Sequence, residues 1–468
     1  MDNSLLIRNA TLSDGRVVDI RCSAGRIDEI GASLGRRLDE DDIDVGTGRV
    51  LPGLHDHHIH LRSLAATAHS IRLGPPTVPD AAALRRVLAG AAQAAPSGTW
   101  LRAFGYHESV AGPLTRDELD ELVPNHPIRV QHRSGALWML NSPACRAAGV
   151  DECTSPGVER DATGRAVGRL WRMDSWLGDA VPSTPPDLGE VCRRAAVRGV
   201  TGFTDATPDL TQAAIEDLAG VVESGQIRQR VHCMARPTIT APTVPAATGR
   251  FTLGPTKILL DDDRLPDLDE FVGIIREAHR VGRPVAVHCV TRVQLILTMA
   301  ALDTAGVIDG DRVEHGAIIP PECFDWLREH RITVITQPNF PLERADQYAA
   351  EVPPTETPDL WRLGTLRDAG VAVAAGTDAP FGDPDPWKAI HAAAVDHSGR
   401  DPREKVGVDV ALGMFAGTGD DPLTTRRIEP GAVADLAVVR GEIDSVRNDP
   451  DSVEVAATVV GGVPIHLG

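Results

Sequence analysis

Short β-branched runs alternate with longer helical stretches through the middle of the 468-residue chain. Eight of these runs are brief and bounded by turn residues, which predicts strands. Helical segments lie between most of them, for example 268–281 and 323–329. Eight such alternations predict an α/β fold with a TIM-like (β/α)8 barrel, whose catalytic residues lie at the carboxyl ends of its strands. The expected strands are 50–61, 199–205, 230–234, 256–260, 284–288, 311–315, 332–336 and 371–378.

The two ends of the chain have a different pattern, in which short strand-like runs are separated by turns. We expect residues 1–50 and 425–468 to pair into one small β-sandwich domain; two unrelated β-edges are the alternative. Residues 51–424 then form the metal-binding barrel domain. Within it, residues 62–198 are too many for one crossover helix, so we expect an insertion after the first barrel strand.

Charge and composition limit the class of partners. The chain has 66 acidic and 47 basic residues and a formal net charge of −19. Such a surface repels phosphate backbones, so no nucleic acid is expected as a partner. No apolar run reaches the roughly 18 residues of a membrane span, and residues 1–4 do not begin a signal peptide. Seven cysteines without a C-x-x-C pair indicate reduced thiols, which predicts a cytoplasmic protein.

The strongest local signal for chemistry is the histidine-rich segment 52–60. Alternate residues of a strand face the same way, so His58 and His60 project together and could chelate a metal ion. A surface histidine cluster is the alternative, but this cluster follows an apolar strand and contains an aspartate. His55 and His57 have the opposite parity, so packing or supporting roles are expected for them.

Three further candidates end predicted strands. His288 and His315 could each be a packed core histidine, but their place at a strand's carboxyl end favours a ligand role. Asp378 ends the eighth strand within Gly376-Thr377-Asp378-Ala379-Pro380. It could cap a helix. As a metal ligand and proton shuttle it would instead explain the small residues around it.

Lys257 interrupts an otherwise apolar strand in a chain that has only three lysines. Arginine would serve a salt bridge better. A neutral lysine amine, by contrast, can react with carbon dioxide to give a carbamate, and that anion can bridge two metal ions. An ion pair with one of the aspartates at 261–263 is the alternative.

Taken in order, these motifs resemble the amidohydrolase superfamily of metal-dependent hydrolases. Within it they resemble the amidohydrolase family 3 branch, which includes N-substituted formamide deformylases. The resemblance covers nearly the whole chain, and the ordered set is specific although any one motif is weak. The motifs are Asp56-His57-His58-Ile59-His60, Lys257 with Asp261, His288, Arg312-Val313-Glu314-His315, Gly376-Thr377-Asp378-Ala379-Pro380, Pro384–Ile390 and Pro430–Leu436.

Branch-level segments are present as well, with departures from the usual pattern. Tyr106-His107 stands where the branch more often has Trp-Asp, and Asp262-Asp263 stands where it often has glycine. These departures put the substrate in doubt more than the metal site. The resemblance implies a set of pocket-lining residues, each of which could instead be structural: Tyr106, His107, Arg133, Trp138, Gln337, Asn339 and Phe340.

The resemblance implies a binuclear centre. One metal ion would be held by His58, His60 and Asp378, and the other by His288 and His315, with carboxylated Lys257 bridging them. Zinc is the default for such a site, and cobalt or manganese can occupy similar ligands. Some branches use one metal, in which case His288 or His315 would contact substrate. A metal-activated hydroxide would attack the substrate while Asp378 shuttles the proton.

Three functions remain open from the sequence. The first is hydrolysis of a non-peptide C–N bond in a small-molecule amide, formamide, carbamate or thiocarbamate. The second is hydrolytic deamination or dechlorination of a heterocycle by the same chemistry. The third belongs to another class, a non-catalytic binding protein on a decayed barrel, and the intact ligand set argues against it. Homo-oligomers are common in the family, so we expect one here.

Overall fold

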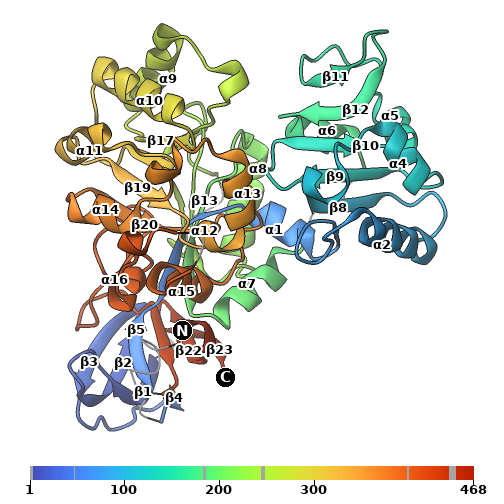
Figure 1. Cartoon of the computed structure of the whole chain (residues 1–468). Helices are drawn as coiled ribbons and strands as arrows, with labels where there is room; N and C mark the ends of the chain where they lie inside the picture. The colour runs from blue at the N-terminus through green and yellow to red at the C-terminus, as the bar shows by residue number, and fades with distance from the viewer. Residues whose placement is uncertain (1–3, 47, 183–185, 244–247, 398–399, 442–448) are drawn as a thin grey trace. The chain divides into compact units, whose positions relative to one another are not determined.

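The computed structural model describes residues 4–468 except 47, 183–185, 244–247, 398–399 and 442–448 (Figure 1). The chain divides into two compact units. One unit combines residues 1–61 with residues 188–468, and the other is residues 62–187. Among the described residues, no helix is long and apolar enough to cross a membrane.

Two parallel sheets lie at the centre of the first unit, in the strand orders β15-β14-β13-β6 and β16-β17-β18-β19-β20. Every expected strand is present, and β15 is an additional one. The chain is therefore an α/β protein, as predicted, whereas closure of the sheets into a barrel stays a prediction. The strands are β6 (Leu54–Ile59), β13 (Val200–Asp205), β14 (Arg230–Cys233), β15 (Phe251–Leu253), β16 (Thr256–Ile258), β17 (Val285–Cys289), β18 (Arg312–His315), β19 (Thr333–Thr336) and β20 (Ala372–Ala375).

Helices connect these strands and present apolar residues at helical spacing. In α9 (Leu268–Arg280), Phe271, Val272, Ile275 and Ala278 are buried, and the side chain of Asp267 caps the first turn. The predicted helix at 268–281 is thus confirmed to within one residue. The other helices of the first unit are α7 (Leu188–Ala196), α8 (Gln212–Glu223), α10 (Arg292–Ala305), α11 (Phe324–Glu329), α12 (Phe340–Glu343), α13 (Ala345–Glu351), α14 (Leu363–Asp368), α15 (Pro386–Ala394) and α16 (Val408–Gly413). The helix α1 (Leu61–Thr67) begins at Leu61, and its remaining residues belong to the second unit.

The expected first strand, 50–61, is two strands that belong to different sheets. β5 (Arg49–Pro52) pairs antiparallel with β21 (Leu436–Val439), whereas β6 pairs parallel with β13. Pro52 has no N–H to continue a ladder. A Cβ atom at Gly53 would overlap the side chain of Thr201, so the chain turns from one sheet to the other where only glycine fits.

Strands from both ends of the chain share one sheet in the order β23-β22-β21-β5-β1-β2-β3, with β4 paired to β1. Its apolar face includes Leu5, Ile7, Ile20, Leu436 and Val438. The strands form one hydrogen-bonded sheet, and a β-sandwich arrangement stays a prediction. They are β1 (Ser4–Thr11), β2 (Val17–Ser23), β3 (Arg26–Gly31), β4 (Glu40–Asp44), β21 (Leu436–Val439), β22 (Val455–Val460) and β23 (Val463–Leu467).

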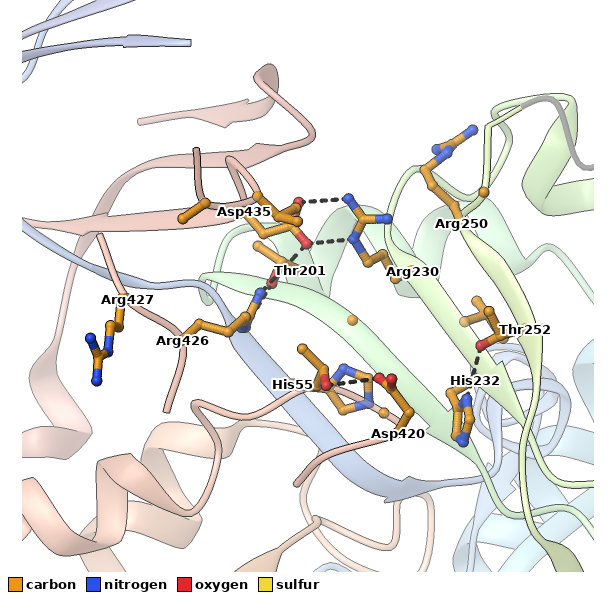
Figure 2. A pocket seen from close by; sticks show the side chains of 17 residues that line it. His55, Thr201, Arg230, His232, Arg250, Thr252, Asp420, Arg426, Arg427 and Asp435 are labelled. Carbon is orange, nitrogen blue, oxygen red and sulfur yellow. Dashed lines mark hydrogen bonds and ion pairs between the residues drawn. The ribbon is translucent and has the colours of Figure 1, made fainter. Parts of the chain in front are cut away.

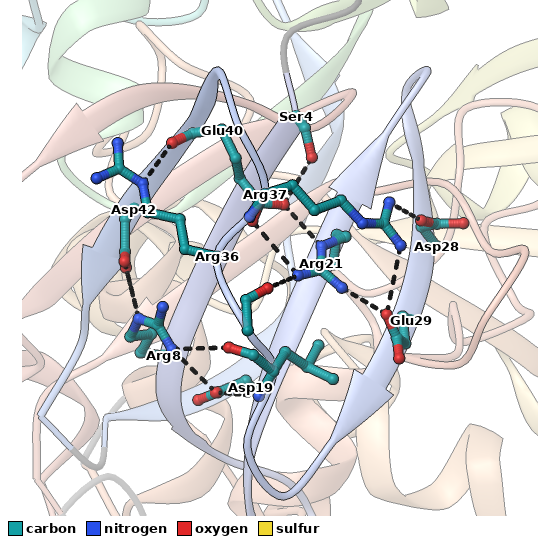
Figure 3. Close-up of polar contacts among 12 residues, drawn as sticks. Ser4, Arg8, Asp19, Arg21, Asp28, Glu29, Arg36, Arg37, Glu40 and Asp42 are labelled. Carbon is teal, nitrogen blue, oxygen red and sulfur yellow. Dashed lines mark hydrogen bonds and ion pairs between the residues drawn. The ribbon is translucent and has the colours of Figure 1, made fainter.

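A polar network lies on this sheet, as Figure 3 shows. The Arg21 side chain is 3% exposed, and its Nε atom donates to Glu40 Oε1 at 2.7 Å. Ser4 Oγ and the backbone N–H of Arg37 also donate to the Glu40 carboxylate. Burial raises the pKa of Glu40, but these hydrogen bonds outweigh it and hold the pKa at about 2. The carboxylate is therefore ionised throughout the physiological range.

The second unit, residues 62–187, has its own mixed sheet in the order β11-β12-β10-β9-β8-β7. β7, β8 and β9 run parallel, and the remaining pairs are antiparallel. The strands are β7 (Ile71–Arg72), β8 (Leu101–Tyr106), β9 (Ile128–His132), β10 (Leu137–Leu140), β11 (Val158–Arg160) and β12 (Ala166–Trp171). The helices are α2 (Ala81–Ala94), α3 (Glu108–Ala111), α4 (Arg116–Leu122), α5 (Ser142–Ala148) and α6 (Asp174–Ala180).

Candidate metal centre

Four of the predicted ligands meet at the carboxyl ends of the parallel strands. Potential ligand atoms of His58, His315 and Asp378 lie within 4.8 Å of one another. His60 follows β6 directly, and its Nε2 atom is 3.1 Å from Asp378 Oδ1. All four side chains are buried. Strands that are remote in sequence thus bring imidazoles and a carboxylate to one point.

The remaining two predicted ligands adjoin this group. The His288 ring, on β17, lies 4.6 Å from the His315 ring between centroids. Lys257, on β16, is close enough for the charges of Glu314 and Asp378 to act on it. Burial lowers the pKa of Lys257, and those two carboxylates only partly offset the effect. All six residues are therefore in one neighbourhood, and the ligand role of each stays a prediction.

The backbone has an uncommon conformation at two of the candidate ligands. His315 has a φ of 69° and Asp378 a φ of 53°, in the left-handed region that non-glycine residues seldom adopt. The N–H of Asp378 donates to the carbonyl of His58 at 2.7 Å. A Cβ atom at Gly376 would collide with the His58 backbone, so glycine permits this approach. The segment after β20 is thereby held against β6.

Two buried acidic residues form hydrogen bonds to the candidate ligands or to their neighbours in the chain: Glu314 bonds His58, and Asp56 bonds Thr377, the residue before Asp378. His58 Nδ1 is hydrogen-bonded to Glu314 Oε2, and Arg312 Nε donates to Glu314 Oε1 at 2.6 Å. Burial opposes ionisation of Glu314, but Arg312 and His58 hold its pKa well below the ordinary value. Asp56 accepts hydrogen bonds from both the N–H and the hydroxyl of Thr377.

Glu314 has no predicted role of its own, although an acidic residue near an arginine on a predicted strand is a signal that the sequence offers. Its partner His58 is far away in the sequence, so the contact itself could not be foreseen. Burial, with Lys257 as a further contribution, lowers the pKa of His58 to about 4, so its imidazole is neutral at pH 7.

The residues fit a divalent metal ion. His58 Nε2 is buried and has no hydrogen-bond partner among the described residues, while its Nδ1 is engaged by Glu314. A buried nitrogen without a partner costs roughly 1–3 kcal/mol, which a metal bond would offset. Carboxylate–histidine–metal chains have this arrangement, in which the carboxylate fixes the tautomer. Imidazole and carboxylate donors also suit zinc and its neighbours.

The sequence also named Gln337, Asn339 and Phe340 near this site. Gln337 Oε1 lies 2.7 Å from His315 Nδ1 and accepts its proton, so the amide orients a candidate ligand. Asn339 Nδ2 donates to Glu343 Oε1, and the Phe340 ring packs edge-on against Trp361. All three are buried in the first unit.

His55 and His57 lie on the same strand as His58 but away from the ligand group. Their rings are 4.6 Å apart, and His55 Nε2 is 2.9 Å from the hydroxyl of Thr204. Burial lowers the pKa of both rings well below the ordinary value, so they are neutral.

The other four predicted pocket residues belong to the second unit. The Tyr106 hydroxyl donates to the carbonyl of Gly112, and the ring is in the core of that unit. Trp138 Nε1 donates to Asp174 Oδ1 at 2.8 Å. His107 follows β8, and Arg133 follows β9.

A cavity of about 320 Å³ lies at the starts of β13 and β14 in the first unit, and none of the predicted ligands lines it. Figure 2 shows Arg230 and Arg426 turned toward Asp435. Arg230 Nε is 2.6 Å from Asp435 Oδ2, and Arg426 also donates to the carbonyl of Gly53. These arginines tie the terminal sheet to the parallel strands.

A comparison with protein families gives a match to the amidohydrolase family 3 model over residues 42–466. The chain belongs to the amidohydrolase family. It is therefore a hydrolytic enzyme acting on C–N bonds, and the resemblance seen in its motifs is confirmed.

Individual relatives of this amidohydrolase extend over nearly its whole length. The N-substituted formamide deformylase of Arthrobacter pascens is 24% identical over 98% of this chain and 97% of that protein. A metal-dependent hydrolase of unknown specificity from Pyrococcus furiosus superposes with a TM-score of 0.70 at 18% identity, over 94% of this chain and 99% of that one. N-isopropylammelide isopropylaminohydrolase from Burkholderia multivorans gives 0.56 at 17% identity, over 99% and 98%. The structural matches show a shared fold.

Proposed function

We propose that this amidohydrolase cleaves the C–N bond of an N-substituted formamide or a related small amide at a divalent metal centre. One observation carries the proposal: His58, His315 and Asp378 converge in a buried site where His58 Nε2 has no hydrogen-bond partner among the described residues. The substrate class follows the activity of the Arthrobacter pascens relative, an N-substituted formamide deformylase that aligns over 98% of this chain.

The proposed ligand set follows the strand ends. His58, His60 and Asp378 would hold one ion, and His288 and His315 a second, with zinc as the expected metal. Lys257, carboxylated by carbon dioxide, would lie between them. The lowering of the Lys257 pKa by burial supports this modification, because only the neutral amine reacts with carbon dioxide.

We also infer that the two parallel sheets close into one (β/α)8-type barrel around this centre. The backbone bond from Asp378 to His58 joins the segment after β20 to the end of β6. β15 and β16, at the other pair of sheet edges, are consecutive in the chain. The similarity in fold to a metal-dependent hydrolase supports the same arrangement.

When bound, the metal ion supplies a Lewis acid and lowers the pKa of a water molecule from 15.7 to about 7. Burial opposes ionisation of Asp378, but His60, His58 and His315 hold its pKa well below the ordinary value. Asp378 is thus an ionised carboxylate that accepts the proton of the attacking water and delivers it to the leaving nitrogen. Glu314 and Gln337 fix the orientation of His58 and His315 meanwhile.

An apolar cluster beside the centre fits the substituent on the substrate nitrogen. The Phe381 ring stands edge-on to the His60 ring with centroids 5.3 Å apart. Phe381 and Tyr348 pack against the buried cluster that contains Phe340 and Trp361. The whole chain has only 17 aromatic residues, namely 8 Phe, 7 Trp and 2 Tyr, so aromatic side chains are concentrated in this cluster of four. We infer that an aryl or branched alkyl group binds there.

The proposal is tested on untagged protein purified without chelator or added metal. Elemental analysis should give at least one equivalent of a divalent metal per chain, of which one or two belong to the centre containing Asp378, and a panel of N-substituted formamides should release formate. Asp378→Asn should keep the metal and lose turnover. Turnover of halogenated or amino heterocycles with no formamide cleavage would favour the deaminase or dechlorinase alternative. Failure to take up any metal would contradict the proposed centre altogether.

A further inference from the structure

A second group of potential metal ligands lies in the unit formed by residues 62–187. β8 and β9 are neighbouring parallel strands, and Tyr106, the last residue of β8, pairs in register with His132. His107 follows Tyr106 directly, and Glu108 opens α3. Carboxyl ends of adjacent parallel strands place such side chains at one edge of a sheet.

The three side chains converge at that edge. One ligand atom each from His107, Glu108 and His132 lies within 4.8 Å of the others. His132 Nε2 is 2.8 Å from Glu108 Oε2, and the two imidazole rings have centroids 5.7 Å apart. The His132 side chain is 13% exposed and that of Glu108 is 36% exposed, so an ion can reach a site that is already partly desolvated.

Both histidine rings are hydrogen-bonded at Nδ1 to a serine two residues later in the chain. His107 Nδ1 lies 2.9 Å from Ser109 Oγ, and His132 Nδ1 lies 2.8 Å from Ser134 Oγ. The backbone N–H of each serine donates to the same Nδ1 atom, at 3.2 and 3.1 Å, so Nδ1 is an acceptor in both rings. The proton of each neutral imidazole is therefore on Nε2, and in His132 that proton is donated to the Glu108 carboxylate. A metal ion bound at Nε2 would take the place of this proton.

We propose that His107, Glu108 and His132 form a site for a divalent transition metal that shares no ligand with the candidate centre containing Asp378. Two imidazoles and one carboxylate make a three-ligand set with open positions, which suits zinc. Bonds of roughly 2.0–2.1 Å would draw the three donors closer together. Because the donors come from the residue that follows β8, from α3 and from β9, the ion would tie these elements to one another.

The chemistry of the site favours nitrogen-seeking metals over calcium or magnesium. Two of three ligands are imidazoles, whereas those cations take oxygen ligands. Arg169 Nη1 is 4.0 Å from Glu108 Oε1. The positive charge of Arg169 offsets the negative charge of Glu108, which is the only carboxylate among the three proposed ligands.

The test compares zinc binding by full-length variants that have first been stripped of metal. Equilibrium dialysis should show one equivalent fewer in His132→Ala and in His107→Ala than in the wild type. Glu108→Gln keeps a hydrogen-bond acceptor for His132 and should bind that equivalent at least about tenfold more weakly. His69→Ala is the matched control, because His69 is an exposed histidine in the same unit and should bind as the wild type does.

A second measurement separates this site from the centre containing Asp378. Asp378→Ala should reduce zinc binding independently, so that the loss in Asp378→Ala/His132→Ala equals the sum of the two single losses. Circular dichroism of each variant checks the fold. Equal stoichiometry and affinity in the wild type, His107→Ala and His132→Ala would overturn the proposal, and so would an equal loss in His69→Ala.

Discussion

The Nδ1 atom of His58 is hydrogen-bonded to the carboxylate of Glu314, which leaves the Nε2 atom of the same ring 3.6 Å from Asp378 Oδ1. The two residues are 256 positions apart in the sequence. Because one nitrogen is committed to an acceptor, the tautomer is defined and the other nitrogen carries the lone pair. Glu314 therefore acts as a positioning residue for the proposed centre.

Glu314→Gln should weaken metal affinity by roughly 10- to 100-fold, the range for loss of a supporting carboxylate. The amide no longer attracts the His58 Nδ1 proton as strongly, and Arg312 loses its buried counter-ion. Competition with a chromogenic chelator measures the affinity. The control is Glu322→Gln, at an exposed glutamate paired with Arg292. Unchanged metal affinity in Glu314→Gln would show that the hydrogen bond has no role in coordination.

Asp378→Asn should lower kcat by roughly 10²- to 10⁴-fold, the range for loss of general acid–base catalysis. The asparagine preserves the shape of the side chain but cannot carry the proton. Steady-state kinetics on protein of measured metal content tests this expectation. Asp368→Asn, at an exposed aspartate, is the control and should retain activity. Near-normal turnover in Asp378→Asn would remove the proton shuttle from the mechanism.

Lys257→Arg should prevent carbamate formation, because a guanidinium group stays charged and does not react with carbon dioxide. Wild-type protein exposed to ¹³C-bicarbonate should show a carbamate signal in the ¹³C NMR spectrum, and Lys257→Arg should not. Lys388→Arg is the matched control, since Lys388 is a half-exposed lysine paired with Asp383. A signal that persists in Lys257→Arg would place any carbamate elsewhere.

The network around Glu40 predicts how stability depends on pH. The pKa of Glu40 is about 2 in the folded chain, below its ordinary value of 4.5. A carboxyl group with a lowered folded pKa contributes stability above its unfolded pKa and loses it as the pH falls toward the folded pKa. The free energy of unfolding should therefore decline between pH 4.5 and about 2, as urea titrations at each pH would show. Glu40→Gln should be less stable at pH 7 and lose less stability over that window. An identical pH profile in the variant would assign the acid sensitivity to other groups.

Phe381→Ala should change substrate selectivity more than it changes the chemistry. Removing the ring beside His60 should lower kcat/KM for a formamide with an aromatic N-substituent by about tenfold or more, and have little effect on N-methylformamide. Kinetics on the two substrates side by side test the expectation. An equal loss on both would mean that the ring supports His60 rather than the substituent.

The sequence located the six strand-end candidates because the relevant signal is local. Each of His58, His60, His288 and His315 lies at or next to the carboxyl end of a predicted strand, and parallel strands bring such ends together. The roles of Glu314 and Gln337 could not be foreseen, since each depends on which side of a ring it meets. Those contacts are set by strand register and by backbone with positive φ at His315.

Other features escaped the sequence analysis for physical reasons. β15 is three residues long and has too few positions to show a period. The turn at Gly53 divides a continuous apolar run, and the cause is the side chain of Thr201 on another strand. The mixed sheet in residues 62–187 is built from short strands whose pairing depends on burial over the whole unit.

The division at Gly53 has a consequence for protein engineering. β5 lies between β1 and β21 in the terminal sheet and ends at Pro52. The strand that bears His58, β6, begins only two residues later, at Leu54. A truncation at either terminus, or a fusion that displaces β22 or β23, would remove neighbours from the sheet that anchors this strand. Metal occupancy would then report on damage to the chain ends, so an expression tag belongs in an exposed loop, not at a terminus.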